Sequence, residues 1–119
     1  MKDIFLSDEY HGIGIEYFLS GKKKRKMKYE KGKALSKCYG ILYDENDKEV
    51  YIGYLINGKP EYAKDITIYD DNDFKIYRGE FKSYLFEGKG TLYFENNNKI
   101  YFNGIFKKNM FTNGILYDL

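Results

Sequence analysis

Short apolar runs that end in tyrosine recur along the chain at nearly even intervals. Tyr43, Tyr69, Tyr93 and Tyr117 close the runs GILY, ITIY, GTLY and GILY. Tyr17 extends this series backwards by one more interval of similar length. A period of about 25 residues is typical of a repeat array, in which each supersecondary unit buries its apolar face against the next unit.

A second aromatic motif follows three of these tyrosines after eight or nine residues. Its copies are YIGYL at 51–55, YRGEF at 77–81 and FNGIF at 102–106. Alternate residues of a strand share one face, so the aromatic residue, the glycine and the apolar residue of each copy lie together. The segments between the two motifs are rich in Asp and Asn, which favour tight turns. Each unit is therefore predicted to be a β-hairpin.

These motifs resemble the MORN repeat, whose pattern is YxGxF, a short spacer and GxGxΦxY. Residues 77–81 (YRGEF) and 88–94 (GKGTLYF) follow this pattern almost fully. Residues 51–58 and 102–117 follow it with altered spacing. The resemblance covers about residues 12–119. It implies an all-β fold, namely a single-layer antiparallel β meander of about four to five MORN-like β-hairpin repeats.

The first unit departs most from the family pattern, because Arg25, Met27 and Tyr29 stand where the family has Tyr, Gly and Phe. This unit is similar to the degenerate MORN-like repeats of bacterial antitoxin-type proteins. We expect one repeat domain over residues 1–119, with an N-terminal segment at 1–11. Within it we expect units at about 12–39, 40–65, 66–89 and 90–113, and a partial fifth unit at 114–119.

The composition fits a thin sheet, because tyrosine can pack its ring while its hydroxyl stays in water. The 119 residues include 14 tyrosines, 12 glycines, one proline and no tryptophan. No apolar run approaches the ~20 residues that span a bilayer. The first residues lack the apolar core of a signal peptide, and Cys38 is the one cysteine of the chain. These features lead us to expect a cytoplasmic protein.

Catalytic and metal-binding motifs are not evident. His11 is the sole histidine, and neither His11 nor Cys38 has a sequence context typical of an activated nucleophile. The acidic cluster at 70–73 lacks the alternating ligands, central glycine and closing glutamate of a calcium loop. We therefore expect no enzymatic activity, no cofactor and no metal.

Exposed aromatic side chains are the predicted partner-binding site. A single-layer sheet has no second sheet to cover it, so tyrosines should stay partly exposed, and rigid aromatics often anchor protein interfaces. The candidates also include large residues expected in connecting loops. They are Tyr51, Tyr77, Tyr84, Leu85, Phe86, Tyr93, Tyr101 and Phe111. The alternative is that these rings only pack on one another along the sheet.

A basic run in the first unit is the alternative site, for anionic lipid or nucleic acid. It consists of Lys22, Lys23, Lys24, Arg25, Lys26 and Lys28. Strand alternation would split it, with Lys24, Lys26 and Lys28 on one face and Arg25 on the other. The competing interpretation is a solvated hairpin, and the net charge of +2 gives no strong global attraction.

The last strand, at 114–119, is expected to leave an edge that pairs with another copy of the chain or with a partner protein. The resemblance also makes a homodimer plausible. The leading hypothesis is a non-enzymatic protein–protein interaction module, such as a small regulator, an immunity or antitoxin-type protein, or an inhibitor that occludes its partner. The alternative is peripheral binding to anionic lipid, or to nucleic acid, through the basic first unit.

Overall fold

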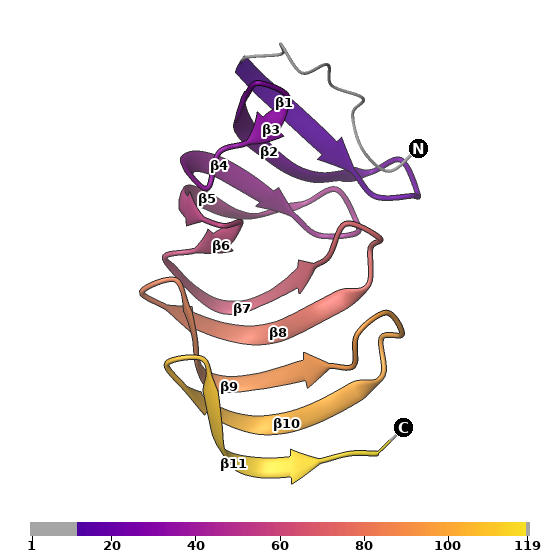
Figure 1. Ribbon diagram of the computed structural model, residues 1–119, viewed down its shortest axis with the longest axis vertical. Coiled ribbons are helices and arrows are strands. Elements are labelled where there is room, and N and C mark those ends of the chain that lie inside the picture. Colours follow the sequence, from indigo (N-terminus) through magenta and orange to yellow (C-terminus); the bar gives the residue numbers. More distant parts are fainter. Residues whose placement is uncertain (1–11, 119) are drawn as a thin grey trace. The chain divides into compact units, whose positions relative to one another are not determined.

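The computed structural model describes residues 12–118 and is built entirely from antiparallel strands and turns (Figure 1). The first sheet contains β1 (Gly12–Tyr17), β2 (Lys23–Glu30), β3 (Lys33–Ala34), β4 (Lys37–Tyr43), β5 (Glu49–Ile56) and β6 (Lys59–Pro60). The second contains β7 (Tyr62–Tyr69), β8 (Lys75–Lys82), β9 (Leu85–Tyr93), β10 (Ile100–Lys107) and β11 (Met110–Leu116). The predicted all-β fold of antiparallel hairpins is confirmed, and the described residues contain no helix that could cross a membrane.

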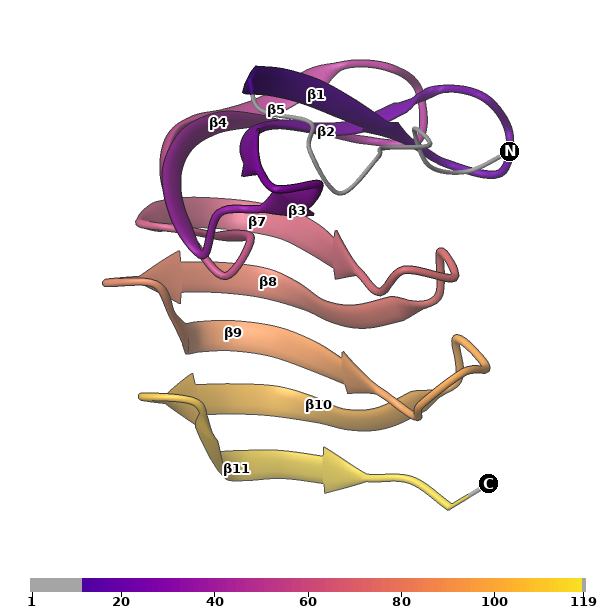
Figure 2. The same cartoon turned by 45° about the horizontal axis from the view of Figure 1, so that its top comes forward.

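Most consecutive strands pair as neighbours within each sheet. The first sheet has the order β1-β2-β4-β5-β6, with β3 beside β2. The second has the order β11-β10-β9-β8-β7, and its five strands can be followed one beside the next in Figure 2. The chain divides into two compact units between Gly58 and Lys59. The grouping of all repeats into one domain stays a prediction.

Two of the polar turns within the hairpins are closed by aspartate side chains. Asp44 Oδ1 accepts hydrogen bonds from the backbone N–H groups of Asn46, at 2.8 Å, and Lys48, at 3.1 Å. Asp70 closes its turn in the same way, and Asp73 takes up a positive φ of 66° that aspartate tolerates better than most residues. The prediction that these acidic segments form turns is confirmed.

A different turn connects successive repeats. It has two residues, both with φ between 49° and 78°, which is the geometry of a type I′ hairpin turn. Its four copies are Lys31–Gly32, Asn57–Gly58, Ser83–Tyr84 and Lys108–Asn109. Because the turn is so short, Leu85 and Phe86 belong to β9, and the expectation that they lie in a connecting loop is wrong.

One face of the second sheet carries its core and is called the inner face. Tyr77, Phe81, Phe102 and Phe106 lie there, each almost completely buried. Their rings meet edge to face, with centroids 5.1 Å apart for Tyr77 and Phe81 and 5.3 Å apart for Phe102 and Phe106. Such contacts stabilise a core beyond the area that they bury.

The first sheet has a corresponding inner face. The register pairs Cys38 with Leu55, Gly40 with Gly53, and Leu42 with Tyr51, so these residues point to the same side. Its buried apolar residues include Met27, Tyr29, Cys38, Leu42 and Leu55. The opposite face of each sheet is called its outer face.

Candidate binding surfaces

Tyr77 lies in the core of the second sheet, which corrects the expectation that it stays exposed. Phe86 stacks on its ring with centroids 4.0 Å apart, and Phe106 meets its edge at 5.2 Å. The Tyr77 hydroxyl donates a hydrogen bond to the Glu80 carbonyl oxygen at 2.9 Å. Burial, reinforced by the Glu80 carboxylate, raises the pKa of this hydroxyl. The fully buried ring has no surface to offer a partner in this fold.

The turn residue Tyr84 and the neighbouring Leu85 and Phe86 are half-buried. The Tyr84 backbone N–H donates to the Glu61 carbonyl oxygen at 3.3 Å, and its φ is 67°. Phe86 contacts both Tyr77 and Phe81 and is therefore a core ring with a partly open side. These three predicted site residues are consecutive and lie together in the structure, but Phe86 packs mainly against the core of the second sheet.

The remaining predicted aromatic anchors lie on different strands. Tyr51, in the first sheet, donates its hydroxyl hydrogen bond to the Tyr54 carbonyl oxygen at 2.7 Å. Tyr93 is half-buried, and burial raises the pKa of its hydroxyl. Tyr101 and Phe111 do come together, with ring centroids 6.1 Å apart.

The basic run is distributed over different environments. Lys24 is 3% exposed, and its Nζ lies 5.7 Å from the centre of the Phe18 ring. Lys23 lies over the Tyr43 ring, whereas Lys22 and Lys28 are exposed. The six basic residues therefore do not share one open surface.

Arg25 is held by an ion pair on the inner side of the first sheet. Its Nη2 donates to Glu16 Oε1 at 2.7 Å, and the Tyr29 hydroxyl donates to Glu16 Oε2 at 2.6 Å. Burial disfavours the Glu16 carboxylate, but Arg25 and Tyr29 stabilise it more strongly, so the pKa of Glu16 is lowered. This cluster stabilises the hairpin β1–β2, which removes Arg25 from the candidate anion site.

The edge strand β11 is exposed along all seven of its residues. Ile115 and Leu116 are 59% and 58% exposed, and Met110 is more exposed than either. Among the described residues, β10 is the one strand that pairs with β11. The predicted edge at 114–119 therefore presents apolar side chains as far as Tyr117. Leu119, the last residue of that predicted edge, lies outside the described residues. The same is true of His11, the sole histidine.

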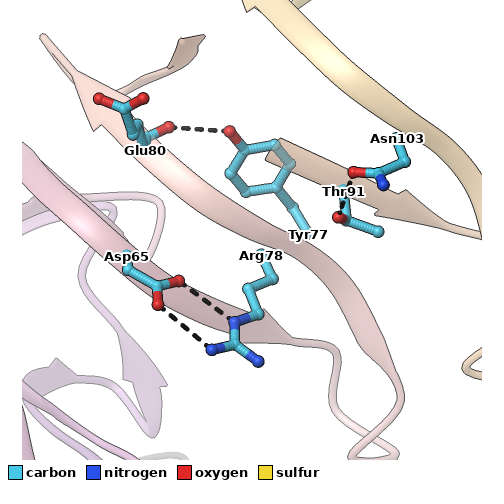
Figure 3. A network of polar contacts seen from close by, with 6 residues as sticks. All are labelled: Asp65, Tyr77, Arg78, Glu80, Thr91 and Asn103. Carbon is cyan, nitrogen blue, oxygen red and sulfur yellow. Dashed lines mark hydrogen bonds and ion pairs between the residues drawn. The ribbon is translucent and has the colours of Figure 1, made fainter. Parts of the chain in front are cut away.

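The outer faces of the two sheets differ in chemistry. On the second sheet, Arg78 donates from Nε and Nη2 to the two carboxylate oxygens of Asp65, both at 3.2 Å. Thr91 donates its hydroxyl hydrogen bond to Asn103 Oδ1 at 3.0 Å on the same face (Figure 3). The hydrogen bond and charge of Asp65 raise the pKa of Arg78.

The outer face of the first sheet carries isoleucine and tyrosine side chains in place of these polar and charged ones. Ile41 pairs directly with Ile52, and Tyr39 pairs with Tyr54. Tyr39 is 70% exposed and Ile52 is 57% exposed. This surface was not predicted from the sequence, although the alternation of these residues with Gly40 could have revealed it.

Chemical groups for metal binding are not assembled among residues 12–118: no cluster of three or more His, Cys, Asp or Glu residues could hold an ion there. Cys38 is a free thiol that is buried in the first sheet. The described surfaces therefore offer shape, hydrogen bonds and charge for binding.

Comparison with known proteins gives one family match. Residues 77–99, which cover most of β8, all of β9 and the following turn, match the model of the MORN repeat. No curated protein and no solved structure matches the chain. The similarity of the first unit to antitoxin-type repeats finds no support in these comparisons.

Proposed function

We propose that this chain, which carries a MORN repeat at residues 77–99, is a non-enzymatic module that binds a partner protein. MORN repeats generally take part in binding to proteins or to membrane lipids. The observation that carries the choice between these two is the exposed edge strand β11, with Ile115 and Leu116 open to solvent.

An open strand edge favours a protein partner for a physical reason. It presents a row of backbone N–H and C=O groups, and a second strand can satisfy that row group by group. A lipid bilayer offers no matching ladder of donors and acceptors. Apolar side chains beside the edge then add contact area to the hydrogen bonds of strand addition.

Binding of this kind suits a small regulator or inhibitor. The chain needs to perform no reaction, because occupying a partner's surface is enough to keep other molecules away. An immunity or antitoxin-type role is one form of this activity and is part of the proposal.

The test is a charge substitution on β11. We expect Ile115→Lys combined with Leu116→Lys to weaken capture of the partner at least about tenfold, because lysines on an edge strand oppose strand addition. The matched control is Ile76→Lys, which places a lysine at an exposed position of β8, an interior strand of the second sheet. Captured proteins are identified by mass spectrometry from a lysate of the source cells, and binding is repeated with purified components.

Two results would count against this proposal. One is a partner retained equally by the wild type, the β11 variant and the control. The other is retention on vesicles of phosphatidylcholine and phosphatidylserine, with no protein captured at comparable salt concentration.

A further inference from the structure

The outer face of the first sheet is an exposed apolar surface with positive charges set into it. The pairs Ile41–Ile52 and Tyr39–Tyr54 lie side by side across β4 and β5. Ile13, on β1, is also exposed on this face, because it pairs with Lys28 and alternates with the buried Gly14. Contiguous apolar surface of this kind usually marks a binding site.

Lysines interrupt the apolar rows of this face. Lys26 is paired with Ile15 on one side and with Ile41 on the other, and Lys28 is paired with Ile13. Lys37, at the start of β4, is paired with Ile56. Glu30, at the end of β2, adds a negative charge opposite Lys33.

None of Lys26, Lys28 and Lys37 forms an ion pair within residues 12–118. The face therefore has an excess of positive charge that its own residues do not neutralise. A carboxylate from another molecule would find these charges available, and complementary charge of this kind selects partners and speeds their association.

The second sheet shows that this chemistry is not required by the fold. Asp65 and Arg78 follow Tyr39 and Ile52, respectively, by the same interval of one repeat. Asp65 and Arg78 pair with each other, so at these two positions the second sheet carries polar side chains whose charges neutralise one another (Figure 3). The first sheet departs from this arrangement at the same positions of the repeat.

The mixture of residues favours a protein over a bilayer. Ile15, Lys26, Ile41 and Ile52 form a row across four neighbouring strands, which are spaced at about 4.8 Å. A bilayer places its phosphates and its acyl chains at different depths. A protein segment can place a carboxylate between two apolar side chains at one depth, as this row requires.

We propose that the outer face of the first sheet binds a protein segment that presents acidic and apolar side chains in turn along one of its faces. This inference shares the premise of protein binding with the proposed function, but it uses a surface separate from β11. A partner segment would set its apolar side chains against Ile41, Ile52 and Tyr39. Its carboxylates would meet Lys26 and Lys28.

The probe is a synthetic peptide of about eight residues, long enough in extended form to cross the row. Glu and Leu take turns at every second residue, with Ser between them, so that both lie on the same face of the extended peptide. A second peptide replaces each Glu with Lys, and a third collects all Glu residues at one end. Binding is measured by fluorescence anisotropy, and NMR shifts of backbone amides locate the contact. We expect the alternating acidic peptide to bind at least about tenfold more tightly than the basic peptide.

Charge reversal provides the variant. We expect Lys26→Glu with Lys28→Glu to weaken binding of the acidic peptide at least about tenfold and to create binding of the basic peptide. The matched control is Lys82→Glu with Lys107→Glu, on the outer face of the second sheet, which should change affinity less than about twofold. If the reversed variant fails to fold by circular dichroism, Lys26→Gln with Lys28→Gln serves in its place.

Ile52→Ser tests the apolar part of the surface. It should weaken binding of the acidic peptide, and the NMR shifts that the peptide causes at the β11 amides should stay small. Equal affinity for the acidic and basic peptides would overturn the inference, and so would binding to vesicles alone. Loss of peptide binding in the Ile115→Lys, Leu116→Lys variant, with Lys26→Glu and Lys28→Glu silent, would move the site to β11. That result would overturn this inference and leave the proposed function standing.

Discussion

The spacing of the aromatic motif follows from the contact between one ring and one glycine. The rings of Tyr77 and Phe102 lie over the glycine two residues further on, Gly79 and Gly104, and over a glycine of the next strand. A Cβ atom at any of these glycines would collide with the ring or with neighbouring backbone. The glycine of the motif is therefore a packing requirement.

Gly90 offers a direct test of this contact. A methyl group there would overlap the Tyr77 ring and its hydroxyl oxygen, and the fully buried Tyr77 has little room to move. We expect Gly90→Ala to lower the free energy of unfolding by about 1–3 kcal/mol, as overpacked cores do. Urea denaturation measures the change. The control Thr91→Ala, on the outer face, should lose less, and an equal loss would contradict the ring contact as the cause.

Glu16 makes the stability of the β1–β2 hairpin depend on pH. Burial opposes its charge, but Arg25 and Tyr29 prevail and lower its pKa from the ordinary 4.5. A lowered folded-state pKa adds stability that is fully present above the unfolded pKa and is lost as pH falls through the folded pKa. Glu16 is 13% exposed. We expect Glu16→Gln to cost about 1–3 kcal/mol at neutral pH, because Arg25 loses its charged partner.

The measurement is urea denaturation at a series of pH values. The difference between wild type and Glu16→Gln should shrink as pH falls below 4.5. Glu95→Gln, at an exposed turn position, is the control and should follow the wild-type curve. A difference that stays constant from neutral to acid pH would show that the ion pair is not responsible.

Tyr84 holds a bulky side chain in a left-handed conformation, with φ of 67°. Asn109 occupies the equivalent turn position with φ of 72°, and asparagine tolerates this geometry well. We expect Tyr84→Asn to raise the free energy of unfolding by about 1 kcal/mol. Tyr39→Asn, the same change in a regular strand, should lower it. Thermal unfolding compares the two, and destabilisation by Tyr84→Asn would mean that the ring's packing outweighs the backbone strain.

At the scale of strands and turns, the period of the sequence predicted most of the hairpins. Apolar alternation located β4, β5, β8 and β10, and clusters of Asp and Asn located the turns between hairpin strands. The two-residue turn at Ser83–Tyr84 was missed because tyrosine carries no signal for a positive φ, whereas glycine marks the same turn at Asn57–Gly58.

Burial was harder to predict than secondary structure. Alternation assigns Tyr77 to a face of β8, but it does not say that Phe86 and Phe106 will cover the ring. That information lies in strands that follow later in the chain. For the same reason Tyr77 was expected to stay exposed, and the exposure of Tyr39 and Ile52 was overlooked.

The same ring-stacking contact occurs once on an interior strand and once on the edge strand, so the two positions can be compared directly. Phe86 stacks on Tyr77 at 4.0 Å and Phe111 stacks on Phe102 at 4.3 Å, but Phe111 lies on the edge strand β11 and is exposed. We expect Phe86→Ala to cost about 3–5 kcal/mol, and Phe111→Ala at most about half of that. Urea denaturation measures both. Equal costs would mean that the β11 edge is as well packed as the interior.

At the scale of the molecule, charge and apolar surface are distributed separately over the two units. The net charge of +2 conceals the unneutralised Lys26 and Lys28 on the first sheet and the paired Asp65 and Arg78 on the second. Each unit therefore offers a different kind of contact: a charged apolar face in the first, and an open strand edge in the second.

The β11 edge can also pair with itself. Two copies related by a two-fold axis would place their β11 strands antiparallel, and such an isologous contact leaves neither β11 edge open to a third copy. We expect the chain to form a homodimer through residues 114–118 at sufficient concentration. In sedimentation equilibrium, Ile115→Lys with Leu116→Lys should raise the dimer dissociation constant at least about tenfold. The reason is that the lysines of the two copies would lie close together across the β11–β11 contact and repel one another.

Ile52→Lys is the control here, because it adds a lysine at a similarly exposed position of the first sheet. It should leave the dissociation constant unchanged if β11 forms the contact. A dimer that survives the β11 charges and dissociates with Ile52→Lys would instead pair through the outer face of the first sheet. A chain that stays monomeric at all accessible concentrations would leave β11 open for another protein, and its strand addition would then depend on that partner alone.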